Sequence, residues 1–109
     1  MRFAAITAVF CLGVAAAAAA QDAKVARGQQ LFTDQKCTLC HSIGDKGNKK
    51  GPLDGVASKL SADDIRSWIT DAKAMIAKTK PTRKPEMKAF TLPKEDVDAL
   101  VAYLVTLKQ

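Results

Sequence analysis

Two cysteines and a histidine lie close together in this 109-residue chain, in the run Cys37-Thr38-Leu39-Cys40-His41. Two thiols separated by two residues can add to the two vinyl groups of a haem. The histidine that follows the second thiol is then held beneath the iron, where imidazole is a common axial ligand. The spacing therefore predicts one covalent haem c per chain, bound through Cys37 and Cys40, with His41 on the iron.

Other chemistries of these cysteines are weaker alternatives. A disulfide between Cys37 and Cys40 would close a very small loop and would constrain the unfolded chain little. A thioredoxin-like redox pair shares the spacing, but its fold needs alternating strands and helices that the hydrophobic periodicity does not indicate. A structural zinc site needs four ligands, and beyond the leader described next the chain has these two cysteines and His41. A dithiol oxidoreductase without cofactor remains open as an alternative function.

Residues 1–20 have the pattern of a secretory signal peptide. A positively charged start is followed by an apolar run and by small residues up to Ala20. An uncleaved membrane anchor is the alternative, because the run from Phe3 to Ala20 is only just long enough to span a bilayer. We expect cleavage after Ala20, with Cys11 leaving in the leader. Residues 21–109 would then form the mature domain, located in the periplasm without stable membrane insertion.

The composition fits one small domain and excludes a multidomain enzyme. Hydrophobic residues make up 48% of the chain and charged residues 26%, a balance that disfavours disorder. Aromatic residues are only 6%, so a cofactor would help to fill the core. The formal charge is +6, or one unit less without Arg2, and the exported location disfavours nucleic acid as a partner.

Two amphipathic segments at the ends of the mature chain predict helices. Residues 22–35 carry one apolar stripe, and Asp22 is a candidate N-cap. Gly28 lies in the middle of this segment, where glycine costs about 1 kcal/mol relative to alanine, and this indicates that another backbone approaches closely. Residues 93–108 carry the clearest apolar stripe in the chain, with Pro93 suited to the first turn.

The intervening sequence predicts a further helix and a loop. Ser61 is expected to cap a helix over the residues that follow, with Trp68 in the core. The stretch 44–55 contains four glycines and Pro52 without apolar periodicity, which predicts a loop. Because this loop follows His41, a carbonyl within it can accept the free N–H of the imidazole and orient the ring. A plain solvent loop is the alternative.

Together these features resemble the small class I bacterial cytochromes c, over nearly the whole mature chain from Val25 to Leu107. The resemblance implies an all-α fold with three or more helices packed around one covalently attached haem. It also implies that Gly28 and Phe32 of the first helix pack against Leu100 and Tyr103 of the last.

The resemblance also assigns residues around the haem. It gives the carbonyl that accepts the His41 N–H to Pro52 and places Leu53 on the haem ring. The second axial ligand decides the function, and no second histidine is present in the sequence. Met75 ends an apolar run typical of core packing, whereas Met87 lies in a polar loop with prolines, shortly before the last helix, as the ligand methionine does in the family. Met87 is the expected ligand; Met75, a lysine amine and an open position are the alternatives.

Ligation by histidine and methionine would fill both axial positions and favour ferrous iron. The chain is therefore expected to be a soluble, monomeric one-electron carrier and not an enzyme. A haem enzyme or gas sensor with an open sixth position is the alternative.

A basic cluster beside the expected haem edge predicts acidic redox proteins as partners. A solvated charged face is the alternative explanation of these side chains. The basic cluster consists of Lys46, Lys49, Lys50, Lys78, Lys80, Arg83, Lys84 and Lys88.

Overall fold

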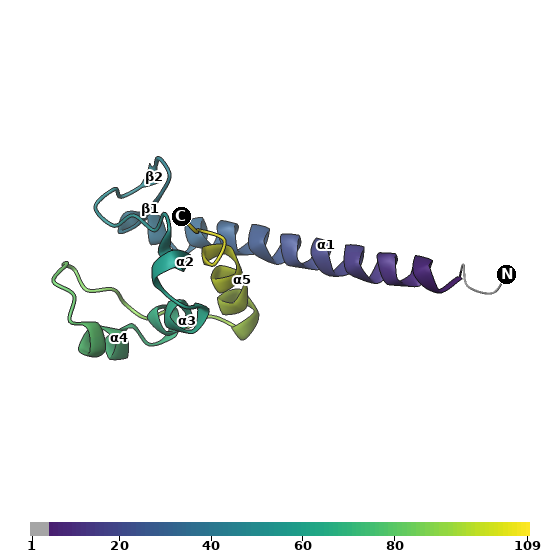
Figure 1. The fold of residues 1–109 in the computed structure, drawn as a ribbon. Helices are drawn as coiled ribbons and strands as arrows, with labels where there is room; N and C mark the ends of the chain where they lie inside the picture. The colour runs from purple at the N-terminus through teal and green to yellow at the C-terminus, as the bar shows by residue number, and fades with distance from the viewer. Residues whose placement is uncertain (1–4) are drawn as a thin grey trace.

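The structure, a computed structural model, describes the backbone of residues 5–109 and the side chains from residue 13 onward. The chain is mostly helical, so the expected all-α class is confirmed, and one very short hairpin is added to it (Figure 1). In chain order the elements are α1 (Ala5–Asp34), the 3₁₀ helix η1 (Cys37–Leu39), β1 (Ser42–Ile43), β2 (Lys46–Gly47), α2 (Val56–Lys59), α3 (Ala62–Thr70), α4 (Ala72–Thr79) and α5 (Lys94–Leu104).

The first helix is longer than the segment predicted from the sequence. It runs without a break from Ala5 to Asp34, so Asp22 lies inside it. The expectation that Asp22 caps the start of the helix is therefore wrong for the full-length chain. The alanines of residues 15–20 explain the difference. Alanine has the highest helix propensity, so the helix continues through them and does not begin at Asp22.

The predicted leader is only partly described. Residues 1–4, and the side chains of residues 5–12, among them that of Cys11, lie outside the described part of the chain. Residues 13–24 are all exposed, and Figure 1 shows α1 projecting away from the other helices on this side. Within the part of the chain that is described, no helix combines the length and the apolar character needed to cross a membrane. Cleavage after Ala20 remains a prediction.

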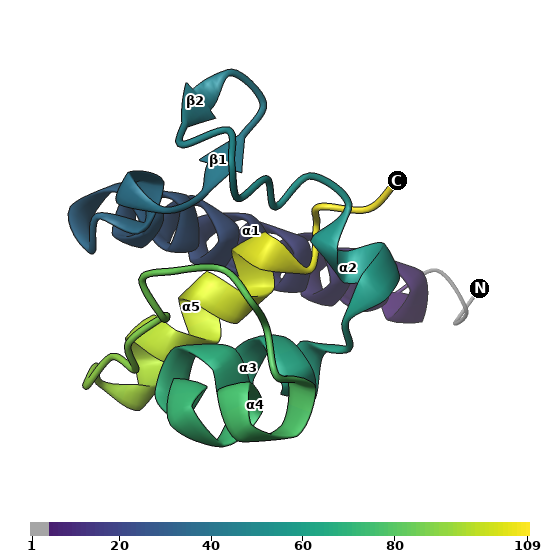
Figure 2. The ribbon, with the colours of Figure 1, turned by 90° about the vertical axis from the view of Figure 1, so that its left-hand side faces the viewer.

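Helices α1 and α5 cross at Gly28 (Figure 2). A Cβ atom at Gly28 would lie 2.7 Å from the Cβ of Tyr103 and still nearer to the carbonyl oxygen of Ala99, so a larger residue does not fit. One turn later, Phe32 meets Tyr103 edge to face, with 6.2 Å between ring centroids and 71° between planes. Leu100 is buried in the same core cluster as Phe32. The predicted contact between these two helices is confirmed.

The last helix is shorter than predicted at both ends. Pro93 stands at the N-cap and not in the first turn, and its carbonyl accepts the N–H of Asp96 at 3.0 Å. The helix ends at Leu104 because the chain then turns toward α2. There the carbonyl of Leu107 accepts the N–H of Ala57 at 3.0 Å. This hydrogen bond ties the C-terminal segment to α2.

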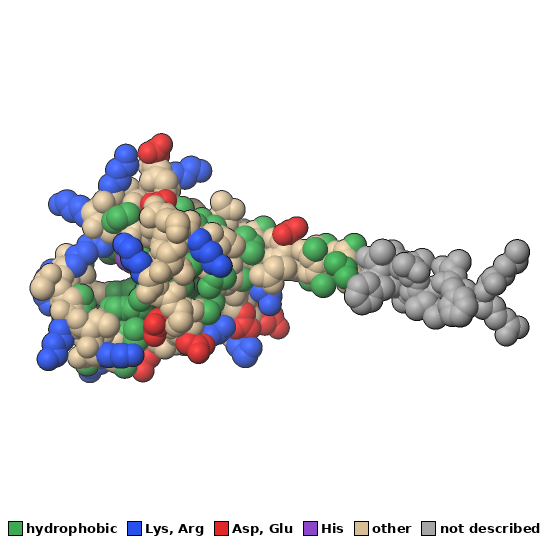
Figure 3. Space-filling view, viewed as in Figure 1, with side chains coloured by type: hydrophobic (Ala, Val, Ile, Leu, Met, Phe, Trp, Pro, Cys, Tyr) green, Lys and Arg blue, Asp and Glu red, His purple; other side chains and the backbone are tan. Residues whose placement is uncertain are grey.

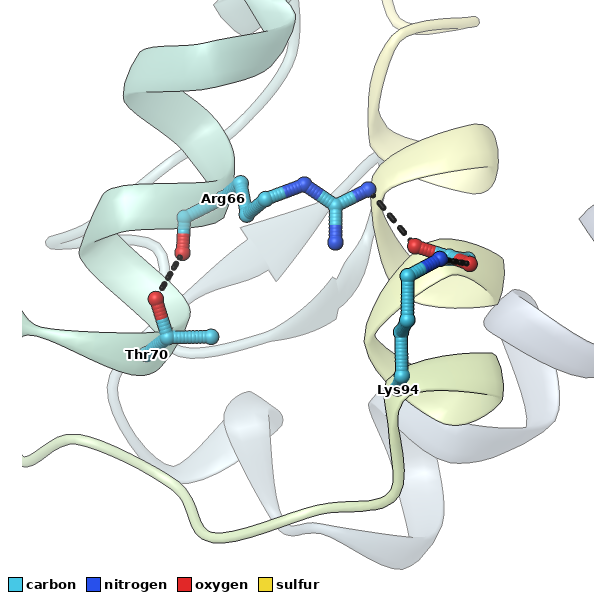
Figure 4. Close-up of polar contacts among 4 residues, drawn as sticks. Arg66, Thr70 and Lys94 are labelled. Atoms are coloured by element: carbon cyan, nitrogen blue, oxygen red, sulfur yellow. Dashed lines mark hydrogen bonds and ion pairs between the residues drawn. The ribbon is translucent and has the colours of Figure 1, made fainter.

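Helix α3 begins as predicted and is linked to α5 by one ion pair. The hydroxyl of Ser61 accepts the N–H of Asp64 at 3.1 Å, which confirms Ser61 as the N-cap. Farther along α3, Arg66 reaches Asp98 of α5 at 2.7 Å, and Lys94 reaches the other oxygen of the same carboxylate at 2.9 Å (Figure 4). Arg66 thus connects α3 to α5, while Lys94 pairs with Asp98 within α5.

The apolar core lies among α1, α3 and α5. Trp68, expected inside it, is only half-buried. The buried members of the core cluster are Leu31, Phe32, Ile65, Ile69, Val97, Ala99, Leu100, Val101 and Leu104.

Candidate haem site

The two thiols and the histidine are brought together by a single tight turn. Lys36 adopts a left-handed conformation, with φ of 60°, and starts the 3₁₀ helix η1. The carbonyl of Cys37 then accepts the N–H groups of Cys40 at 3.2 Å and of His41 at 2.9 Å. Both cysteines are free thiols; Cys37 packs against the core cluster and Cys40 is exposed. One backbone turn directly after α1 therefore holds all three residues.

The imidazole of His41 is oriented by the backbone. Its Nδ1 lies 3.0 Å from the carbonyl oxygen of Gly51. A carbonyl can only accept a hydrogen bond, so Nδ1 carries the proton and donates it. The lone pair of the neutral ring is then on Nε2, the nitrogen left to bind a metal.

The acceptor differs from the one expected, because it is Gly51 and not Pro52. The cause is an isolated parallel bridge between Ser42 and Pro52. In this bridge the Gly51 carbonyl accepts the N–H of Ser42 at 3.1 Å, and the N–H of Leu53 donates to Ser42 at 2.8 Å. Successive carbonyls of an extended strand point in opposite directions, so the one facing His41 is that of Gly51. Leu53 is half-buried and packs against the core cluster.

Burial changes the acid–base properties of the site. It lowers the pKa of His41, and the charge of Arg83 acts in the same direction, while the hydrogen bond to Gly51 opposes both. The imidazole is therefore neutral at pH 7, as a metal ligand must be. Burial also raises the pKa of the Cys37 thiol to about 11. In the folded chain this thiol is protonated at neutral pH and a poor nucleophile, which does not suit a dithiol oxidoreductase.

The two candidate methionines have different surroundings. Met75 is a buried residue of α4, with 7% of its surface exposed. Met87 is half-buried in the 80–93 loop, the segment between α4 and α5. It borders a cavity of about 480 Å³ that is otherwise lined by Lys73, Ile76, Pro85, Glu86, Lys88 and Ala89.

The surface of the molecule has an opening between the segment of His41 and the 80–93 loop. Figure 3 shows an opening with hydrophobic side chains at its edge and Lys and Arg side chains around it. Figure 1 shows that the 80–93 loop and α4 lie on one side of this region, and the segment with β1 and β2 lies on the other. The opening gives a flat apolar group access to the interior, between the segment of His41 and the loop of Met87.

Comparison with known proteins decides the family. Residues 25–108 match the cytochrome c family. The chain belongs to that family. Cytochromes c bind haem c covalently through two cysteines and a histidine in the spacing of Cys37, Cys40 and His41. The site fits this cofactor, because both thiols are free and because the hydrogen bond to Gly51 leaves Nε2 of His41 for the iron.

One curated relative is similar to most of this cytochrome c chain. It is cytochrome c oxidase subunit 2 of Alkalihalophilus pseudofirmus, 30% identical over 91 residues. The matched region covers 75% of this chain and 25% of the relative, so the chain spans about a quarter of that protein's length. No solved structure matches the chain significantly.

Two residues that contact the segment of His41 were not singled out by the sequence. Gly51 is one of four glycines in the 44–55 stretch, and nothing in its type separates it from the others. Arg83 was one member of the basic cluster. The structure sets it apart, because its guanidinium lies against Gly51, next to the carbonyl that holds His41.

Proposed function

We propose that this cytochrome c is an exported one-electron carrier, with His41 and Met87 as the axial ligands of its haem iron. The observation that carries the proposal is the contrast between the two methionines. Met87 borders an open cavity in a loop between helices, whereas Met75 is packed in α4 as an ordinary core residue. A sulfur ligand on the iron makes the protein a carrier, because it leaves no position for a substrate or a gas.

Each residue of the site would make a different contact with the haem. A bound haem supplies an iron that takes up and releases one electron. His41 presents Nε2, and the Gly51 carbonyl fixes the plane of the imidazole by holding Nδ1–H. Cys37 and Leu53 are partly buried and pack on the core cluster, which gives the haem an apolar surface to lie against. Low exposure to water limits the rearrangement that accompanies each electron transfer.

The basic cluster supports acidic proteins as redox partners. All eight of its side chains are exposed, and they belong to β2, α4 and the loops that border the opening. Such a cluster speeds encounters with an acidic surface and loses this effect as salt screens the charges. The relative's name makes an oxidase one acceptor to test. Export to the periplasm is supported by the leader predicted over residues 1–20.

The proposal is tested against its main alternative by adding carbon monoxide to the reduced protein at neutral pH. We expect no binding while Met87 occupies the sixth position, together with a redox titration that fits transfer of one electron. Stoichiometric binding of carbon monoxide would show an open site and would support a haem enzyme or gas sensor instead.

The docking surface is tested with an acidic redox protein as the partner. Lys88→Glu should slow the second-order rate of electron transfer several-fold at low salt, and added salt should remove the difference from wild type. Lys24→Glu is the matched control, because Lys24 is exposed on α1 and is not a member of the basic cluster. Equal slowing by both substitutions would contradict a localised docking surface.

A further inference from the structure

Arg83 and Gly51 form a contact between the two loops on either side of the opening. The guanidinium of Arg83 lies so close to Gly51 that a Cβ atom there would be 2.9 Å from Cζ and still nearer to Nη1. The carbonyl of Cys40 is also within contact distance of that Cβ position. Gly51 is therefore enclosed by Arg83 and by the backbone of the haem-attachment turn, and its missing side chain makes room for both.

This contact reaches the middle of a long loop. The 80–93 loop is fixed at its start, where the N–H of Lys80 donates to Ile76 at 2.8 Å. It is fixed near its end, where the N–H of Phe90 donates to Ile69 at 2.8 Å. Arg83 lies between these anchors and reaches across to the segment of His41. Because a loop held at an interior point has fewer conformations, this contact restricts the residues that follow, Met87 included.

The contact also places a positive charge beside the histidine. The Gly51 carbonyl accepts the Nδ1–H of His41, and Arg83 lies against the same residue. A cation at this position repels any further positive charge that gathers on the group bound to His41. Ferric haem carries one more positive charge than ferrous haem, so the same cation favours the ferrous form.

We propose that Arg83 is a positioning residue that latches the Met87 loop onto Gly51 and raises the reduction potential of the haem held by His41. The proposal rests on the proposed function, because it takes Met87 as the ligand that the latch holds in place. It has two separable parts. The charge acts on the potential, and the flat guanidinium against Gly51 acts on the position of the loop.

The test compares three variants of the haem-containing protein. Arg83→Gln removes both the charge and the contact. Arg83→Lys keeps the charge on a rounder ammonium group, which does not reproduce the planar contact. Lys84→Gln is the matched control, since it removes a charge from the neighbouring exposed residue, whose partner is Glu86 and not Gly51.

Two measurements distinguish the parts of the proposal. The midpoint potential should fall in Arg83→Gln, stay near wild type in Arg83→Lys and change less in Lys84→Gln. The affinity of the ferric protein for added imidazole should rise about fivefold in Arg83→Gln and in Arg83→Lys. The reason is that imidazole displaces Met87 more easily when the 80–93 loop is less restrained. Amide hydrogen exchange over residues 81–89 should accelerate in the same two variants, while exchange in α1 and α5 stays at the wild-type rate.

The latch is overturned if Arg83→Gln and Lys84→Gln give the same potential, imidazole affinity and exchange rates. Loss of protection throughout the protein in Arg83→Gln would also overturn it, since that result indicates a general structural role. Failure of the proposed function has a different signature. In that case the wild-type ferric protein lacks a methionine-to-iron charge-transfer band and binds imidazole without having to displace a protein ligand.

Discussion

Gly28 of α1 lies directly against the carbonyl of Ala99 in α5. The contact lets the two helices approach until Phe32 and Tyr103 meet edge to face one turn farther along. It therefore determines the helix pair on which η1 and the haem-attachment turn are built. The contact between Gly28 and Ala99, which are far apart in the sequence, thus helps to position the haem-attachment turn that follows α1.

Gly28→Ala should destabilise the protein. Alanine would favour the helix by about 1 kcal/mol relative to glycine, but its Cβ would collide with the backbone of Ala99, and overpacking of this kind costs about 1–3 kcal/mol or more. We expect the free energy of unfolding to fall in urea titrations. Gln29→Ala, an exposed change on the same helix, should leave it nearly unchanged. A Gly28→Ala protein as stable as wild type would contradict the close crossing.

The sequence predicted those features that depend on local residue type. Gly28 stands out because glycine is costly inside a helix, and Ser61 because its hydroxyl suits an N-cap; the structure agrees at both positions. The sequence could not distinguish Gly51 from Pro52 as the hydrogen-bond acceptor of His41. The identity of the acceptor depends on the register of the bridge between Ser42 and Pro52.

Other features depend on contacts that no local pattern contains. The end of α5 at Leu104 follows from the hydrogen bond between Leu107 and Ala57, which lie fifty residues apart. Arg83 looks like any other member of the basic cluster until the fold brings it to Gly51. Met87 was predicted from its place in the chain, and its role as a ligand remains a proposal.

Asp98→Asn should reduce stability in a pH-dependent way. Lys94 and then Arg66 hold the pKa of the Asp98 carboxyl below its ordinary value of 3.8. A carboxyl whose pKa is lower in the folded than in the unfolded chain stabilises the fold above pH 3.8, and this contribution is lost as the pH falls through the folded value. Urea midpoints should therefore be lower than wild type for Asp98→Asn at neutral pH.

The same comparison at a pH below the lowered pKa of folded Asp98 should give equal midpoints, because both side chains are then neutral in the folded and the unfolded chain. Asp45→Asn is the control, since Asp45 is fully exposed and 3.7 Å from Lys49. A difference for Asp98→Asn that persists in acid would mean that the substitution acts through packing and not through charge.

The exported protein should have a mass that corresponds to residues 21–109 plus one haem. Residues 13–24 are exposed, so removal of residues 1–20 takes no side chain described here out of the core. Mass spectrometry after denaturation measures both features, because a thioether-linked haem stays on the chain. A chain that retains residues 1–20 would contradict the predicted cleavage. Alkylation of both Cys37 and Cys40 would contradict covalent attachment.

The optical spectrum of the ferric protein tests the assignment of Met87 most directly. A methionine-to-iron charge-transfer band is expected in wild type and in Met75→Ala, and it should be absent in Met87→Ala, where the potential should also fall. Met75→Ala is a demanding control, because it removes a buried side chain and costs stability without touching the proposed ligand. Retention of the band in Met87→Ala, with its loss in Met75→Ala, would show that Met75 binds the iron and that the assignment made here is wrong.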